Sequence, residues 1–181
     1  MGKPFFDRLF GRAPEAAEKT TESTETKAEH GDADAQFVLG INFAGAGGTQ
    51  NYPQAASWYL KAADQGHSLA QFNLAIMYAM GQGMPRDEIQ SMRWMKKAAD
   101  LGDAGAQFRV GMKHHRDSLG SSGEIAHASR IESYMWLQLS AAQGYRGSEQ
   151  ACENIALLMT RDDVANGARR VAAFVPGARR A

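Results

Sequence analysis

The chain has 181 residues, which is enough for one domain with a hydrophobic core and too few for two of ordinary size. Twenty lysines and arginines balance twenty aspartates and glutamates, so the basic excess that is typical of nucleic-acid-binding proteins is absent. The single cysteine, Cys152, excludes an intrachain disulfide framework and a thiolate metal cluster, and no run of about 20 apolar residues is long enough to span a bilayer.

The first segment, residues 1–12, is basic and unusually aromatic. On one side of a helical wheel lie Phe5, Phe6, Leu9 and Phe10, surrounded by Lys3, Arg8 and Arg12. Phenylalanines in a solvated tail predict a docking peptide, and a membrane surface, a partner groove and the protein's own repeats all stay open as its destination. The start Met1-Gly2 suggests myristoylation, but Phe6 stands where Ser or Thr is needed. We expect a cytoplasmic protein, with the inner face of the membrane as the alternative location.

Residues 13–30 are rich in Glu, Thr and Ala and contain no aromatic or large aliphatic residue. Such a segment cannot bury enough apolar surface to offset the entropy lost on ordering. We therefore predict a flexible acidic linker here.

From Gly31 onward the chain repeats itself, with a period typical of helical repeat proteins. The triplet Ala-Gln-Phe begins at residues 35, 70 and 106. Between these copies, Trp58, Trp94 and Trp136 each lie eight residues before a glycine, namely Gly66, Gly102 and Gly144.

Each unit is predicted to contain two helices. Apolar and small residues recur at spacings of three and four, as in Ala35, Leu39 and Phe43 and again in Trp58 and Ala62. The pairs Asn51/Gln54, Asp87/Gln90 and Ser129/Glu132 predict the start of each second helix, and the glycines at 66, 102 and 144 predict its end. Gly40, Ala75 and Gly111 are expected where the two helices of a pair approach closely.

These residues resemble the Sel1-like repeat family, a tetratricopeptide-like group of helical repeats. The second repeat carries the likeness best, through Ala70, Leu74, Tyr78, Gly81, Gly83, Asp87, Trp94, Ala98 and Gly102. The resemblance implies an all-α fold, an α/α-hairpin solenoid forming a right-handed superhelix, with repeats at about 31–66, 67–102 and 103–144 and a helical C-terminal cap at 145–176. The positions that define these repeats are Ala35, Leu39, Gly40, Trp58, Ala62, Gly66, Ala70, Leu74, Tyr78, Gly81, Gly83, Asp87, Trp94, Ala98, Gly102, Trp136 and Gly144.

The third repeat departs from this pattern. His114 stands where Phe43 and Tyr78 stand in the other repeats, and six additional residues fall around 116–124. We predict that they form a longer loop between the two helices.

No candidate for catalysis or metal binding emerges from the residues. His114 and His115 are adjacent and therefore point to different helix faces, without a carboxylate or thiol placed to complete a metal site. Cys152 lies on an apolar helix face with no histidine nearby, and the chain contains no Ser-x-x-Lys motif. We expect neither an enzyme nor a cofactor, and a hydrolase is the weakest alternative.

Binding of another protein is better supported, through the face of each first helix that points away from the second. The predicted groove residues are Phe37, Ile41, Phe72, Asn73, Ile76, Phe108, Arg109, Met112 and His115. For the phenylalanines, packing between repeats is an equal alternative. The resulting hypothesis is an adaptor or scaffold that binds a peptide or helix of a partner protein; a membrane-peripheral protein held by residues 3–12 is the alternative. No nucleic acid or small-molecule substrate is expected.

Overall fold

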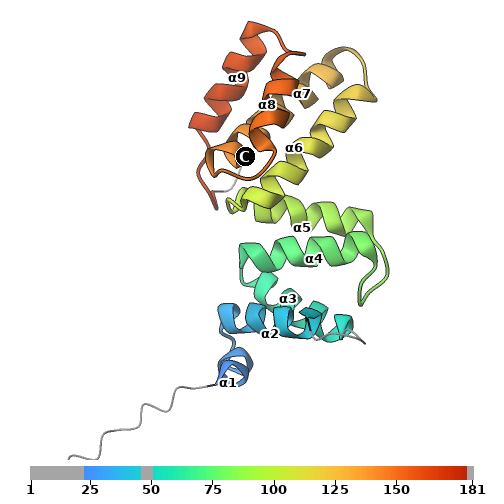
Figure 1. Cartoon of the computed structure of the whole chain (residues 1–181), viewed down its shortest axis with the longest axis vertical. Coiled ribbons are helices and arrows are strands. Elements are labelled where there is room, and N and C mark those ends of the chain that lie inside the picture. The colour runs from blue at the N-terminus through green and yellow to red at the C-terminus, as the bar shows by residue number, and fades with distance from the viewer. Residues whose placement is uncertain (1–22, 46–50, 179–181) are drawn as a thin grey trace, which may run out of the picture.

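The computed structural model describes residues 23–45 and 51–178, and every regular element in these ranges is a helix. In chain order they are α1 (Thr24–Glu29), α2 (Ala33–Gly45), α3 (Tyr52–Asp64), α4 (Ser68–Met80), α5 (Glu88–Asp100), α6 (Ala104–Leu119), α7 (Gly123–Ala142), α8 (Ser148–Ala156) and α9 (Arg161–Ala172). They follow one another along the long axis of the molecule, from α1 at one end to the cap at the other (Figure 1). The predicted docking tail at 1–12 lies outside the described residues.

The helices form three antiparallel pairs, α2/α3, α4/α5 and α6/α7, and each pair packs chiefly on the next one along the chain. Contacts restricted to neighbouring units are what distinguishes a solenoid from a globular domain with a single centre. The predicted all-α solenoid of three repeats with a helical C-terminal cap is therefore confirmed.

Tight turns join each pair to the following pair. At these turns Gly31, Gly66, Gly102 and Gly144 all adopt positive φ, between 72° and 99°, a region that residues with a side chain rarely adopt. Each glycine N–H donates to a carbonyl three residues earlier, and the residue after it donates five residues back. This is the Schellman arrangement that satisfies the last carbonyls of a helix.

A buried glutamine reinforces three of these turns, those at Gly31, Gly66 and Gly102, from the following helix. The side-chain amides of Gln36, Gln71 and Gln107 donate to the carbonyls of Ala28, Ala63 and Ala99, over 3.0, 2.9 and 3.2 Å. Because a helix leaves its final carbonyls without partners inside the helix, this bond ties the end of one pair to the first turn of the next. We call this contact the glutamine clamp.

The glutamine clamp shows that α1 belongs to the repeat array. Gln36 binds Ala28 as the other two glutamines bind their alanines, and Ala28 is buried with Ala35 and Leu39. Thus α1 holds the position of the second helix of a preceding repeat. The expected linker at 13–30 differs from the structure over residues 24–29, because the Schellman turn, the clamp and the Ser23 cap stabilise a helix there in spite of its polar composition.

The third repeat also differs from expectation. Its six additional residues lengthen α6 and α7 to 16 and 20 residues, so the connection between them covers only 120–122. Ser129 consequently lies inside α7 and caps no helix. The segment contains no proline, and the ion pair between Lys113 and Asp117 at 2.6 Å supports the last turns of α6. Of the other predicted caps, Asp87 binds the amides of Ile89 and Gln90, whereas the Asn51 side chain makes no cap bond.

Small residues allow the helices within a pair to approach closely. A Cβ atom on Gly40 would lie 2.5 Å from the Tyr59 ring, and one on Gly111 would lie 2.9 Å from Leu137. Ala75, at the equivalent position of the second repeat, is fully buried. Larger side chains there would force the two helices apart.

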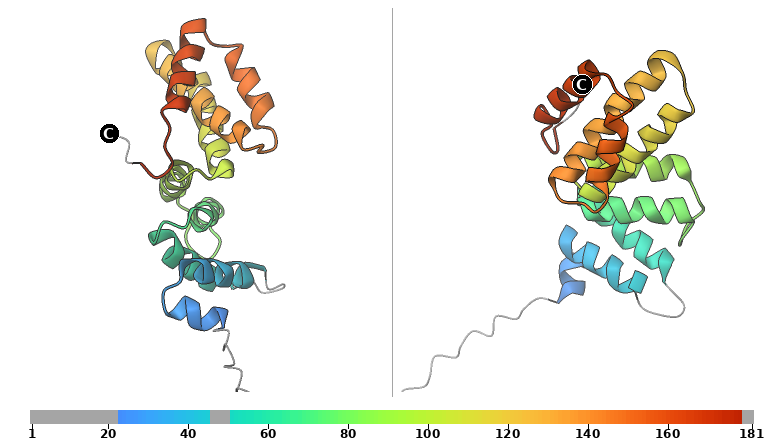
Figure 2. Two further views of the ribbon diagram at one scale, coloured as in Figure 1. Left: turned by 90° about the vertical axis from the view of Figure 1, so that its left-hand side faces the viewer. Right: turned by 45° about the horizontal axis from the view of Figure 1, so that its top comes forward.

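The cap returns toward the middle of the array. Phe174 packs edge-on against the buried Trp136, with ring centroids 5.9 Å apart, and the Gly177 amide donates to the Asp100 carbonyl at 2.9 Å. The last described residues therefore run from α9 back to the end of α5 (Figure 2). Leu101, beside Gly177, occupies the position that Gln65 and Gln143 hold in the other repeats.

Because Leu101 stands where the other repeats have a glutamine, the clamp of Gln71 lacks one hydrogen bond. Gln36 and Gln107 also accept a bond from Gln65 and Gln143, at 2.8 and 2.9 Å, whereas Gln71 Oε1 is buried with no partner among the described residues.

We expect Gln107→Met to lower the free energy of unfolding by about 1–2 kcal/mol, because two hydrogen bonds are lost. In Gln71→Met one lost bond is offset by removal of an unsatisfied oxygen, so we expect a change near zero. Urea denaturation measures both variants. Equal losses would contradict this description of the clamp.

Candidate protein-binding groove

One hollow of the repeat array lies between α4, α5 and α6 and has a volume of about 340 Å³. We call it the second hollow, because it lies between the second and third repeats. Its apolar lining comes from Ile76, Ala79, Met92, Met95, Phe108, Met112 and Tyr145, and its polar lining from Glu88, Ser91, Arg109, Lys113 and Arg116. Three methionines make this lining adaptable, because their unbranched side chains change shape at low cost.

A smaller hollow, of about 190 Å³, lies between α2, α3 and α4. We call it the first hollow; it is lined by Ala44, Tyr52, Tyr59, Asn73, Ile76, Met77 and Gln82. Ile76 lines both hollows, so they adjoin one another along α4. Burial raises the pKa of Tyr59, although a hydrogen bond with Asn73 opposes this.

The two hollows are equivalent positions of successive repeats. A shift of 35 or 36 residues places six residues of the first on six of the second: Ala44 on Ala79, Tyr52 on Glu88, Tyr59 on Met95, Asn73 on Arg109, Ile76 on Met112 and Met77 on Lys113. The solenoid therefore forms the same kind of hollow at each junction between repeats, and the side chains at these positions decide its chemistry.

The structure brings together several of the residues predicted for the groove. Ile76, Phe108, Arg109 and Met112 line the second hollow, and Asn73 lines the first together with Ile76.

Two of the predicted phenylalanines pack between repeats instead. Phe37 stacks on His67 of the following repeat, with ring centroids 4.4 Å apart, and Phe72 lies beside Gly105 and beneath the Arg109 guanidinium. Phe108 does both, since it packs 5.4 Å from Tyr145 and lines the second hollow. The alternative of inter-repeat packing thus describes Phe37 and Phe72.

The remaining two predicted residues, Ile41 and His115, line neither hollow. Ile41 is 44% exposed. In the two hollows α3 and α5 supply part of the lining, whereas the helix that precedes Ile41 at the equivalent place is the short α1. His115 is half-buried on α6, with Nδ1 lacking a hydrogen-bond partner among the described residues.

Sequence reasoning missed the contribution of the second helix of each pair. Tyr59 and Met95 each follow the repeat tryptophan directly, and Met92 precedes Met95 by three residues on the same helix face. The recurrence of a large side chain directly after the repeat tryptophan could have predicted this contribution.

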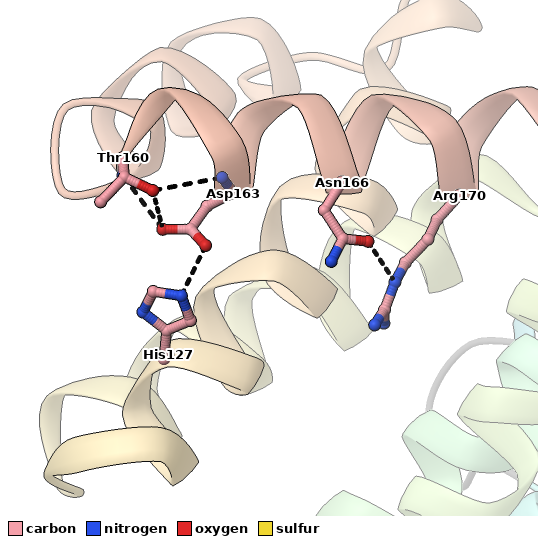
Figure 3. A network of polar contacts seen from close by, with 5 residues as sticks. All are labelled: His127, Thr160, Asp163, Asn166 and Arg170. Carbon is pink, nitrogen blue, oxygen red and sulfur yellow. Dashed lines mark hydrogen bonds and ion pairs between the residues drawn. The ribbon is translucent and has the colours of Figure 1, made fainter.

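One polar network outside the hollows brings together a histidine, an aspartate and a threonine, side chains that are common in catalytic sites (Figure 3). Here the aspartate and the threonine form the N-terminal cap of α9. His127 Nε2 lies 2.5 Å from Asp163 Oδ1, while Asp163 Oδ2 accepts from the hydroxyl and the amide of Thr160. The Thr160 hydroxyl therefore donates to the carboxylate and not to the histidine that would have to activate it. The network caps α9 and joins it to α7.

The other residues considered for chemistry have unreactive environments. Burial raises the pKa of the Cys152 thiol to about 11, so the nucleophilic thiolate is scarce at neutral pH. Burial also lowers the pKa of His114, against the opposing charges of Glu132 and Asp117. Within residues 23–45 and 51–178, no three His, Cys, Asp or Glu side chains are grouped closely enough to hold a metal ion.

The Asp163 cap makes stability depend on pH. Burial raises the pKa of Asp163, but hydrogen bonds from Thr160 and the neighbouring His127 lower it by more, so the folded pKa lies below its ordinary value. A lowered folded pKa stabilises the native state above the unfolded pKa of about 3.9, and that stabilisation is lost as the pH falls through the folded value.

We therefore expect Asp163→Asn to lower the free energy of unfolding by about 1 kcal/mol near pH 7, in the range measured for helix caps. The difference from wild type should shrink as the pH falls below about 4. Urea denaturation between pH 7 and pH 3 measures it, with Asp162→Asn as the exposed control in the same turn. A difference independent of pH would contradict the assigned role of the carboxylate.

The fold and the repeat-equivalent hollows define a helical repeat protein. The Sel1 repeat family matches residues 33–67, 68–103 and 104–145, which together cover more than half of the chain, and the chain therefore belongs to this family. A search of curated proteins found no match.

Two solved structures share the fold. One is a protective antigen from uropathogenic Escherichia coli strains with an SLR fold, at 26% identity and a TM-score of 0.68, covering 83% of this chain and 31% of the antigen. The chain thus spans less than a third of the length of that relative. The other is a Sel1 repeat protein from Oxalobacter formigenes, at 29% identity and a TM-score of 0.61, covering 72% of this chain and 95% of that protein.

Proposed function

We propose that this protein is an adaptor that holds a segment of another protein across its first and second hollows. Sel1 repeats are generally protein-interaction scaffolds, which supports the class of function. The observation that carries the assignment to this surface is the recurrence of a partly apolar hollow at two successive repeat junctions, joined through Ile76.

The geometry suits a polypeptide better than a compact ligand. Both hollows are open and adjoin along α4, so a bound chain can place one side chain in each and continue between them. Short peptides gain most of their affinity from such buried anchors, and the surrounding polar contacts set orientation.

Site-specific photo-crosslinking tests this proposal. With a photoreactive phenylalanine at Arg116, which lines the second hollow, we expect capture of a defined partner that mass spectrometry identifies. The same group at Arg93, an exposed arginine on α5 that lines neither hollow, should not capture it.

The crosslinked segment of the partner, made as a synthetic peptide, should then bind the purified chain in a calorimetric titration. Ile76→Ala should weaken that binding by about tenfold, the usual effect of truncating an anchor contact. Circular dichroism monitors the fold of the variant. Capture from both arginine positions alike, or binding insensitive to Ile76→Ala, would refute the proposal.

Membrane contact through residues 3–12 is the second candidate, based on the aromatic and basic pattern of this segment. Among the described helices none is long and apolar enough to cross a bilayer. Flotation with liposomes containing anionic lipid should recover more of the full chain than of a variant that begins at Ser23. Equal recovery of the two would exclude this contact.

A further inference from the structure

The two hollows are built on equivalent positions but differ in charge. Among its described lining residues the first has no ionisable group apart from the tyrosine hydroxyls, whereas the second has Glu88, Arg109, Lys113 and Arg116. The basic part of this difference arises on the first helix of each pair: Asn73, Met77 and Met80 of α4 correspond to Arg109, Lys113 and Arg116 of α6.

Part of this charge is already balanced within the protein. Lys113 pairs with Asp117 at 2.6 Å, and Glu88 lies 3.6 Å from Arg86. Arg109 lies over the Phe72 ring, 5.7 Å from its centroid, a contact that holds the guanidinium in place without neutralising it. The net charge of the second hollow is therefore positive and comes from Arg109 and Arg116.

These two arginines are placed to act together. They are seven residues apart, which is about two turns or roughly 10 Å along one face of α6, with Lys113 between them. Phe108 directly precedes Arg109 and Met112 lies between the two arginines in sequence, and both supply apolar surface beside this basic row. A complementary ligand combines carboxylates with apolar side chains, since arginine binds carboxylates through paired hydrogen bonds.

We propose that the occupant of the groove is an acidic segment of another protein, whose carboxylates lie along Arg109 and Arg116 while apolar side chains enter the two hollows. The proposal rests on the function proposed above. It adds the chemistry of the partner segment and says which part of that segment lies over which hollow. Its charged part lies over the second hollow, and its uncharged part lies over the first, against Tyr52 and Tyr59.

Selection from a phage-displayed library of random 12-residue peptides on the full-length protein tests this inference. We expect selected clones to be enriched in Asp and Glu next to large apolar residues. Synthetic peptides made from these clones should bind more weakly as the salt concentration rises, because exposed ion pairs are screened.

The repeat itself supplies the matched variants. Arg109→Asn/Arg116→Met introduces the residues that α4 carries at the equivalent positions, and Arg93→Ser introduces the residue that α3 carries, outside both hollows. We expect the first variant to weaken binding of the selected peptides by about tenfold, as for the loss of two exposed ion pairs. Arg93→Ser should bind them as the wild type does.

Each other outcome has a distinct meaning. Clones that require Ile76 but show no acidic enrichment, or that bind Arg109→Asn/Arg116→Met normally, would overturn the inference and leave the adaptor function standing. Clones obtained only with a chain that begins at Ser23 would mean that residues 1–22 occupy the groove, which also overturns it. An absence of clones from both chains would count against the inference and the adaptor function together.

Discussion

The glutamine clamp is the polar contact that recurs where each helix pair begins on the end of the helix before it. A helix ends with carbonyl groups that have no partner within it, and a solenoid must bury several such ends between its units. Gln36, Gln71 and Gln107 meet this requirement in the same way, from the first turn of the following helix. Because the bond joins the end of one helix to the first turn of the next, it helps to hold successive pairs together at the junctions where the hollows are formed.

The same contact is present at the N-terminal end of the array and is altered where the C-terminal residues return to it. At its N-terminal end the clamp orders α1, whose composition alone favours disorder, and thereby adds part of a further repeat. In the middle of the array Leu101 replaces the glutamine that would complete the second clamp and lies instead beside Gly177. A glutamine–glutamine hydrogen bond within the array is thus replaced by packing of Leu101 beside Gly177. This packing helps to position the C-terminal cap.

A regular backbone with variable side chains suits selective binding. The hollows at successive junctions have the same walls, so substitution at a few equivalent positions changes their chemistry without altering the fold. The replacement of Asn73 by Arg109 and of Met77 by Lys113 shows this in one chain. For the partner proposed above, the flexible methionines of the second hollow would adapt to its shape, and the positive charges of the hollow would favour an acidic segment.

By itself the sequence determined the helical class, the three repeats and the glycines that end them, because these follow from local spacing and from backbone conformations that few residues adopt. It also indicated Ile76, Phe108, Arg109 and Met112, since they share a face of consecutive helices. Only the tertiary structure decided that α1 is part of the array, that the additional residues of the third repeat extend α6 and α7, and that Phe37 and Phe72 pack between repeats while Tyr59 and Met95 line the hollows. Those outcomes depend on contacts between residues of different helices, which no periodicity within a single helix specifies.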